Sequence, residues 1–378
     1  MTVHAELGPS SSDRWTTCYG SVALSRGIKD VGSANANEGT MMHAFSAKCL
    51  ETANYAKAYI GEKDAETGLT LSEEQAKDVQ TYVDYVWDIC EATGGTLLVE
   101  QRLPIAWMTN EDGAAGTADA IIITPDELIV VDAKFGFKMV DAVENKQLMM
   151  YAAAAYDEYK IAYDFKSIRV AIVQPRINAT PEWTTTPDSL MAFAAEIAFA
   201  AEQIQSGNDN LVPSEKGCQW CRAKAICPAI KAKVMNDFET VVPETADEDD
   251  LARVMVNANL IESWVKSIRA EVERRLLAGE PVKGYKLVQG KRGNRQWADA
   301  DDAEATLKSM RIKHAQMYDY KLASPTSIEK LVKAEEIGPR QWVKIQDLIT
   351  QSEGTPSVAP ETDKRPALSA TANLSDFD

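Results

Sequence analysis

The hydrophobic positions first follow a helical period and later change to the short apolar runs that are typical of strands. Residues 72–92 predict an amphipathic helix, because their apolar side chains recur every three or four positions and share one face. The positions on that face are Val79, Tyr82, Val83, Val86 and Ile89. Helices are also expected between residues 10 and 60. The residues able to cap them are Ser11, Ser12 and Asn37.

Four downstream runs have the composition and alternation of strands. Pro125 and Asp126 predict the turn between the second and third of them. The fourth run is apolar on both faces, so we expect it at the centre of a sheet. The expected strands cover residues 96–104, 116–124, 127–134 and 168–174, and the expected helices near them cover 145–159 and 188–206. This order predicts a mixed α/β core over about residues 10–235.

The chain changes character from residue 244, where an acidic stretch leads into a long predicted helix that Gly279 ends. The last residues are rich in Ser, Thr, Ala and Pro and have few large apolar side chains, so we expect disorder there. The expected organisation is a core over residues 1–235, a mostly helical accessory region over 244–351 and a disordered acidic tail over 352–378.

Composition narrows the function classes. The 378 residues are 45% hydrophobic and 26% charged, which is ordinary for a globular protein. No apolar run approaches the roughly 20 residues that span a bilayer, and no secretory signal is visible, so a cytoplasmic protein without a membrane partner is expected. The net charge of -17 argues against a protein that coats nucleic acid by bulk positive charge. Six cysteines are too few for a disulfide scaffold of this length.

Four short features with complementary chemistry fall in order along the expected core. They are His43 on an early helix, Asp119 at the start of a strand, Asp132 with Lys134 at the end of the next strand, and Gln147 with Tyr151 on the following helix. Each alone has a plain structural interpretation, such as a solvated strand end or an ordinary helix surface. Their order on suitable elements favours a common site.

The chemistry of these side chains suits hydrolysis of a phosphodiester. Asp119 and Asp132 come from successive strands and can converge on Mg²⁺, which prefers oxygen ligands, while His43 can add a nitrogen ligand that also suits Mn²⁺. Lys134 follows Asp132 by two positions and therefore shares its face of the strand. An ammonium there can orient the attacking water or stabilise the charged transition state.

The pattern resembles the RecB-like branch of the PD-(D/E)XK nucleases, whose members have a helix His, a Gly-x-x-Asp, an Asp-x-Lys and a Gln-x-x-x-Tyr. The resemblance implies a restriction-endonuclease-like α/β core with a mixed sheet flanked by helices and, here, a helical C-terminal extension. It implies the metal ligands His43, Asp119, Asp132 and the backbone carbonyl of Ala133, catalysis by Lys134 with the aspartates, and DNA positioning by Gln147 and Tyr151. Many members have a bulky residue in place of Ala133. Glu100 is a possible auxiliary acid.

Three cysteines, Cys218, Cys221 and Cys227, form half of a soft metal site, with Cys18 as the candidate fourth ligand. The arrangement resembles the RecB-like nucleases in which one cysteine before the core and three after it hold a [4Fe–4S] cluster, such as bacterial helicase-nucleases and CRISPR-associated single-strand exonucleases. Zinc and plain reduced thiols remain alternatives. Cys49 and Cys90 fall on apolar helix faces and are expected in the core.

Residues 283–297 mix basic and aromatic side chains, which suits single-stranded DNA, although a solvated hairpin is an equal alternative. The candidate DNA-binding residues there are Lys286, Lys291, Arg292 and Arg295.

Over nearly its whole length the chain resembles a phage and prophage family catalogued as a domain of unknown function. The segments that carry this resemblance include residues 10–22, 131–136, 284–297 and 361–368. It implies a DNA exonuclease that processes DNA ends in phage-type recombination or replication, inside the host cytoplasm. The tail can dock a single-strand binding or annealing protein. An endonuclease with the same site and a non-catalytic DNA-binding module are the alternatives.

Overall fold

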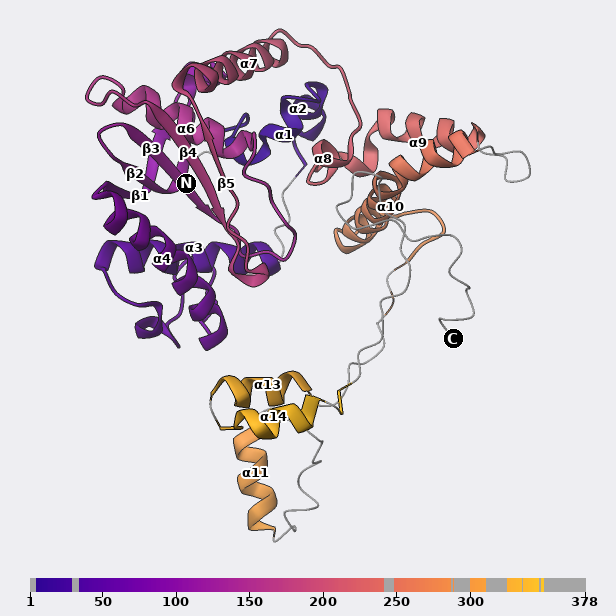
Figure 1. Cartoon of the computed structure of the whole chain (residues 1–378). Coiled ribbons are helices and arrows are strands. Elements are labelled where there is room, and N and C mark those ends of the chain that lie inside the picture. The colour runs from indigo at the N-terminus through magenta and orange to yellow at the C-terminus, as the bar shows by residue number, and fades with distance from the viewer. Residues whose placement is uncertain are drawn as a thin grey trace. The chain divides into compact units, whose positions relative to one another are not determined.

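The computed structural model describes residues 5–28, 34–240, 248–286, 288, 300–310, 325–334, 336–346 and 348–349. The chain divides into two compact units, Met1–Val288 and Gln289–Asp378 (Figure 1). The second unit contains the helices α11 (Ala300–Ser309), α13 (Pro325–Lys333) and α14 (Pro339–Gln346). No helix within the described ranges combines the length and apolar character needed to cross a membrane.

The first unit is built on one mixed five-stranded sheet with the order β1-β2-β3-β4-β5. The pairs β1–β2, β2–β3 and β4–β5 are antiparallel, whereas β3–β4 is parallel. Helix α6 (Lys146–Tyr159) makes the crossover between the two parallel strands, as such a pair requires. The strands are β1 (Thr96–Pro104), β2 (Ala115–Ile123), β3 (Glu127–Ala133), β4 (Ser167–Val173) and β5 (Glu182–Thr185).

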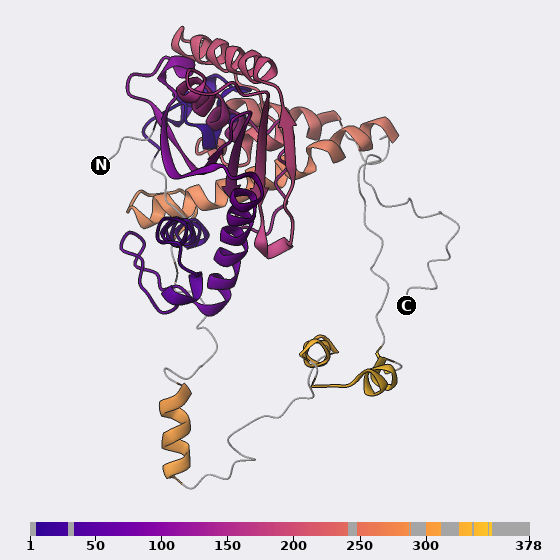
Figure 2. The same ribbon diagram turned by 60° about the vertical axis from the view of Figure 1, so that its left-hand side comes forward.

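Helices cover both faces of this sheet (Figures 1 and 2). Helices α6 and α7 (Pro187–Gln205) bury one face, and α3 (Ala34–Thr52) and α4 (Glu73–Thr93) bury the other. Strands β2, β3 and β4 are apolar on both faces because each face meets a helical layer. The expected mixed α/β fold, with a central fourth strand, is therefore confirmed.

Local sequence signals account for the helices that flank the sheet. Ser72 and Gln75 form a capping box at the start of α4, and Gly94 ends this helix in the left-handed conformation. The side chain of Asn145 accepts a hydrogen bond from the backbone of Leu148 and caps α6. The predicted amphipathic face of α4 is confirmed, since all five of its expected positions are buried.

Three expectations about local structure are corrected. Helix α3 begins at Ala34, so Asn37 lies inside it rather than at its cap. Ser11 stands at the N-cap of α1 (Ser12–Trp15) without a capping hydrogen bond, because its hydroxyl bonds the carbonyl of Gly8 instead. The sequence does not predict strand β5, because it has only four residues and most of their side chains are polar, which gives little hydrophobic signal.

The segments that precede and follow the sheet pack against each other. Helix α1 contacts α8 (Glu215–Cys218), and the long α10 (Glu248–Leu277) packs on η4 (Lys224–Ile226) and on α9 (Pro228–Thr240). A small apolar core joins Cys218, Cys227, Ile230 and Leu260 there. Through Leu260 in this core, α10 belongs to the compact unit Met1–Val288.

Candidate active site

The structure brings four of the predicted site residues together at strands β2 and β3. His43 comes from α3, Asp119 from β2, and Asp132 from β3, and Lys134 directly follows β3. The Nδ1 atom of His43 lies 3.2 Å from Oδ2 of Asp119. The Nζ atom of Lys134 lies 2.7 Å from Oδ2 of Asp132. Two carboxylates from neighbouring strands therefore each face a basic side chain.

Strand register explains why the two aspartates meet. Ala120 pairs with Val131, so Asp119 stands opposite Asp132 one step beyond the last pair of the β2–β3 ladder. The Oδ2 atom of Asp119 accepts the backbone N–H of Ala133 at 2.8 Å, which fixes this carboxylate across the two strands. The prediction that adjacent strands carry both aspartates is confirmed.

Helix α6 adds Gln147 and Tyr151 to the same place. The Nε2 atom of Gln147 donates to Tyr151 Oη at 3.3 Å and, at the 3.5 Å limit, to Oδ1 of Asp132. Gly116 makes room for this helix, because a Cβ atom there would lie 2.8 Å from the Tyr151 ring. The glycine of the Gly-x-x-Asp pattern is therefore required by the close approach of Tyr151 rather than by a turn.

Burial and charge act together on the acidic groups. Burial works to raise the pKa of Asp119, but His43, Lys134 and the Ala133 N–H outweigh it and hold this pKa below its ordinary value. Burial and the neighbouring Asp119 charge raise the pKa of Asp132, against the opposing effect of Lys134. The pKa values of the two aspartates are therefore shifted in opposite directions by their surroundings.

The two basic groups respond to the same carboxylates. Burial works to lower the pKa of His43 and that of Lys134, yet both pKa values lie above their ordinary values because Asp119 and Asp132 stabilise the charged forms. Lys134 is therefore a fixed ammonium at neutral pH. The ring of His43 also packs edge-on against Phe135, with 5.4 Å between the ring centroids.

Two buried polar atoms beside this group accept or donate no hydrogen bond among the described residues. One is Oδ2 of Asp132, which has the Lys134 charge nearby but no well-directed donor. The other is the hydroxyl of Tyr82, whose pKa is raised well above its ordinary value by burial and by the charges of Asp119 and Asp132. A buried polar atom without a hydrogen-bond partner is energetically costly, so these two atoms indicate a place that suits a polar ligand. The sequence predicts a core position for Tyr82 and gives no sign of its place beside the aspartates.

The backbone of β1 has an unusual conformation at Glu100, beside the candidate site. This residue stands opposite Asp119 in the β1–β2 register, has a φ of 46° and leaves the ladder unpaired there. Leu103 and Ala118 pack on the α6 side, whereas Val99 and Ala120 pack on the α3 side, so both strands change faces at this step. A left-handed residue that is not glycine costs about 1–3 kcal/mol and is typical of functional sites.

The carboxyl group of Glu100 is also perturbed. Burial and the Asp119 charge raise its pKa to about 7, although His43 opposes the shift. The structure gives Glu100 an unusual backbone and a raised pKa, and its role as an auxiliary acid stays a prediction. The residue type alone could not indicate this, because the left-handed φ has no signature in the sequence.

The residue types at this site fit a hard divalent cation. Two converging carboxylates and an imidazole are suitable donors, and the chemistry of this donor set fits Mg²⁺ or Mn²⁺. In the described part of the chain, no three or more His, Cys, Asp and Glu side chains stand as a group that could hold a metal ion as placed. The geometry explains this, since His43 and Lys134 occupy the aspartate oxygens.

Of the four cysteines expected to act together, Cys218 and Cys227 share one small apolar core, but among the described residues these thiols form no group of three or more placed to hold a metal ion. Burial raises the pKa of Cys218, and the charges of Cys221, Cys18 and Cys227 act in the same direction. The Sγ atom of Cys18 accepts the N–H of Val212 at 3.3 Å. The Sγ atom of Cys218 accepts an N–H as well, at 3.4 Å from Ser214. All six cysteines are free thiols, and Cys49 is buried, as expected.

Most of the predicted basic segment cannot be compared with the structure. Lys286 is exposed at the end of the first unit. Lys291, Arg292, Arg295 and the tail over residues 352–378 lie outside the described residues.

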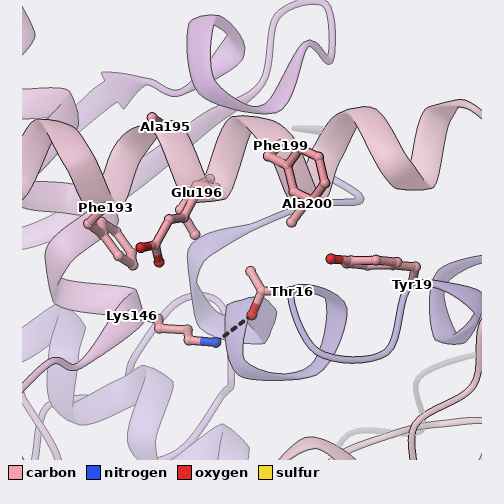
Figure 3. A pocket seen from close by; sticks show the side chains of 9 residues that line it. Thr16, Tyr19, Lys146, Phe193, Ala195, Glu196, Phe199 and Ala200 are labelled. Carbon is pink, nitrogen blue, oxygen red and sulfur yellow. Dashed lines mark hydrogen bonds between the residues drawn. The ribbon is translucent and has the colours of Figure 1, made fainter.

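A separate pocket of about 470 Å³ lies between α7 and the segment that carries Cys18 (Figure 3). Figure 3 shows Lys146 donating to the hydroxyl of Thr16, at 2.6 Å, with Phe193 and Glu196 facing them from α7. Burial lowers the pKa of Lys146. None of the predicted site residues lines this pocket.

The fold and the site define a mixed α/β protein in which two carboxylates, an imidazole and an ammonium meet at strands β2 and β3, with Asp132 buried and the other three side chains partly buried. The chain belongs to the family described as protein of unknown function (DUF2800), whose sequence model matches residues 4–366. A solved structure titled "Crystal structure of SSO0001" is similar over 56% of this chain and 95% of that chain, with 15% identity and a TM-score of 0.25.

Proposed function

We propose that this protein is a metal-dependent DNA nuclease with a RecB-like PD-(D/E)XK core. One observation carries the proposal. Asp119 and Asp132, from neighbouring antiparallel strands, converge with His43 3.2 Å from Oδ2 of Asp119 and Lys134 2.7 Å from Oδ2 of Asp132. A structural ion pair alone has no need for a second converging carboxylate, which raises the electrostatic cost of the site.

The residues have distinct roles in this proposal. Asp119, Asp132, His43 and the carbonyl of Ala133 would hold Mg²⁺ or Mn²⁺. The ion would polarise the phosphate and lower the pKa of a bound water. Lys134, held protonated by the two aspartates, stabilises the negative charge that develops on the phosphate.

Gln147 and Tyr151 position the DNA. The amide of Gln147 already points between Asp132 and Tyr151, so it can donate to a phosphate oxygen that replaces either partner. Hydrolysis at DNA ends, in phage-type recombination or replication, is the form of activity that the family resemblance favours. A docking role of the tail for a single-strand binding or annealing protein rests on its composition alone.

We further propose that Cys18, Cys218, Cys221 and Cys227 hold a [4Fe–4S] cluster, with zinc as the alternative. Four thiols, two N–H···S hydrogen bonds and the nearby cations Arg14 and Lys224 support this assignment. Positive charge and N–H donors both stabilise bound thiolates. The cluster would join the segment before the sheet to the segment after it.

The test is digestion of end-labelled linear DNA by anaerobically purified protein with Mn²⁺ or Mg²⁺. Lys134→Ala should lower the rate by about 10²-fold or more, because it removes the ammonium from the transition state. Lys160→Ala, which changes an exposed lysine paired only with Asp157, is the matched control and should retain the activity. Circular DNA separates the two modes of cleavage, since only an endonuclease cuts it. If wild-type protein with its cysteine site loaded cuts neither substrate, the nuclease proposal fails for this chain.

A further inference from the structure

The loop between Lys134 and α6 exposes large apolar side chains at the edge of the candidate active site. Phe137 is 74% exposed, Met139 56% and Val143 53%. Phe137 is three positions after Lys134, so their Cα atoms lie within about 11 Å of each other. Exposed apolar residues grouped beside a site are more informative than the same residues scattered over a surface.

Hydrogen bonds to a buried side chain hold the backbone of this loop in place. The buried side chain of Gln174 donates to the carbonyl of Lys138 and accepts the N–H of Val140, both at 2.8 Å. These two hydrogen bonds fix the backbone on either side of Met139. The exposure of the loop's apolar side chains is therefore imposed by a buried anchor.

The ring of Phe137 is itself supported on one face. The guanidinium of Arg176 lies 5.3 Å from the ring centroid. Arg176 is fixed in turn, because it donates to Glu38 through two nitrogens and to Asp78 through Nε. A pinned cation under one face and solvent on the other leave an aromatic surface open for stacking.

A second exposed ring lies on the segment that this loop contacts. Trp220 is 82% exposed and follows Gln219, whose Oε1 atom accepts a hydrogen bond from Lys138 at 2.9 Å. Exposed basic side chains lie near the two rings along the sequence. They are Lys138, Lys216 and Arg222. Exposed acids stand in the same two segments, at Asp141, Glu144 and Glu215, so the two exposed rings rather than an excess of positive charge distinguish this surface.

We propose that Phe137 and Trp220 form a stacking platform for unpaired bases of a DNA strand whose backbone enters the candidate active site. The proposal rests on the proposed nuclease function and specifies its substrate as single-stranded DNA or a frayed end. Exposed aromatic rings with interleaved cations bind single strands through stacking and phosphate contacts, and duplex DNA keeps its base faces covered. The platform continues from Lys134, so a strand that stacks on it lies next to the aspartates.

The experiment measures binding without metal, so that cleavage does not enter. Anisotropy of a labelled oligothymidylate in EDTA gives the affinity of wild type, Phe137→Ala and Trp220→Ala. Each variant should bind roughly tenfold more weakly, the loss of one base–ring stack. Phe137→Tyr and Trp220→Phe keep a ring and should restore most of the affinity. Phe199→Ala removes a similarly exposed ring, 57% exposed on α7, and should bind like wild type.

An abasic oligonucleotide of equal length isolates stacking from charge. Wild type should bind it more weakly, and the two alanine substitutions should then have no further effect. Equal losses on both oligonucleotides, unchanged affinity for the oligothymidylate, or no single-strand binding by wild type would each overturn the platform. Self-association that both variants abolish, without single-strand binding, would assign the patch to contacts between copies and also overturn it.

The outcomes separate the platform from the nuclease proposal. DNA cleavage that persists with unchanged single-strand binding in both variants removes the platform alone. Ring-dependent binding by a wild-type protein that cuts no DNA removes the nuclease proposal and leaves a single-strand binding surface. Thermal unfolding of each variant checks that its fold is intact, which is expected because both rings are mostly exposed.

Discussion

At the scale of single residues, the candidate site is a balance of buried charges. Asp119 and Asp132 would repel each other if they stood alone, and His43 and Lys134 offset that repulsion at 3.2 and 2.7 Å. The balance is incomplete, since one Asp132 oxygen has no directed donor. Glu100 adds a further carboxyl group opposite Asp119. Because its pKa is raised, this group is partly protonated near physiological pH. The site is therefore suited to gaining positive charge.

Glu100 makes stability depend on pH in a predictable direction. Its pKa is about 7 in the folded protein and near the ordinary 4.5 when unfolded, so the folded state binds its proton more tightly. The stability that this provides is present below pH 4.5 and is lost as the pH rises through about 7. We expect Glu100→Gln to remove this loss, seen as a flatter dependence of urea unfolding between pH 5 and 8.

The effect should be modest because Glu100 is exposed, so that solvent screens the charges around it. Glu91→Gln changes an exposed glutamate on α4 and serves as the control, which should follow the wild-type pH dependence. Parallel curves for wild type and Glu100→Gln would contradict the assignment.

At the scale of elements, the sequence predicts regular structure well and irregular structure poorly. The face of α4 follows from side-chain period, and the meeting of Asp119 and Asp132 follows from their places on successive strands. The change of faces at Glu100 could not be predicted, because it depends on a left-handed backbone in a residue that rarely adopts one. The partnerless hydroxyl of Tyr82 depends on tertiary packing and had no signal beyond its apolar helix face.

Gly20 controls how the N-terminal segment packs on the segment after α7. Its N–H donates to the carbonyl of Asn210 at 3.0 Å, and a Cβ atom would lie 2.2 Å from the carbonyl oxygen of Asp209. Because backbone cannot yield as a flexible side chain does, we expect Gly20→Ala to cost about 1–3 kcal/mol of unfolding free energy. Urea unfolding measures this, and alkylation of Cys18 should become faster as the contact loosens.

Gly39 is the matched control for this prediction. It lies inside helix α3, and a Cβ atom there would meet nothing within 4 Å. Gly39→Ala should therefore stabilise the protein by about 0.5–1 kcal/mol through helix propensity. An equal effect of the two substitutions would show that the close approach at Gly20 does not determine packing.

At the scale of the whole molecule, the proposed cysteine site would close the first unit. Cys18 precedes the sheet, and Cys218, Cys221 and Cys227 follow it, with α10 packed on the same small core. Two hundred residues of chain therefore lie between Cys18 and the three later thiols. Closing so long a loop removes conformational freedom from the unfolded chain, so a bound metal group should contribute strongly to stability.

Cys18→Ala tests this closure against Cys49→Ala. Cys49 is fully buried on α3, and burial raises the pKa of its thiol to about 11, so it is a poor ligand and a suitable control. Anaerobically purified wild type should contain about four iron atoms per chain and absorb visible light. Cys18→Ala should lose the iron and unfold at a lower temperature, whereas Cys49→Ala should keep it. One zinc ion in place of iron would select the alternative ligand and keep the closure. Wild type without either metal, or Cys18→Ala with full iron content, would contradict the cysteine closure and leave the N-terminal segment held by its packing contacts, such as those at Gly20 and between α1 and α8.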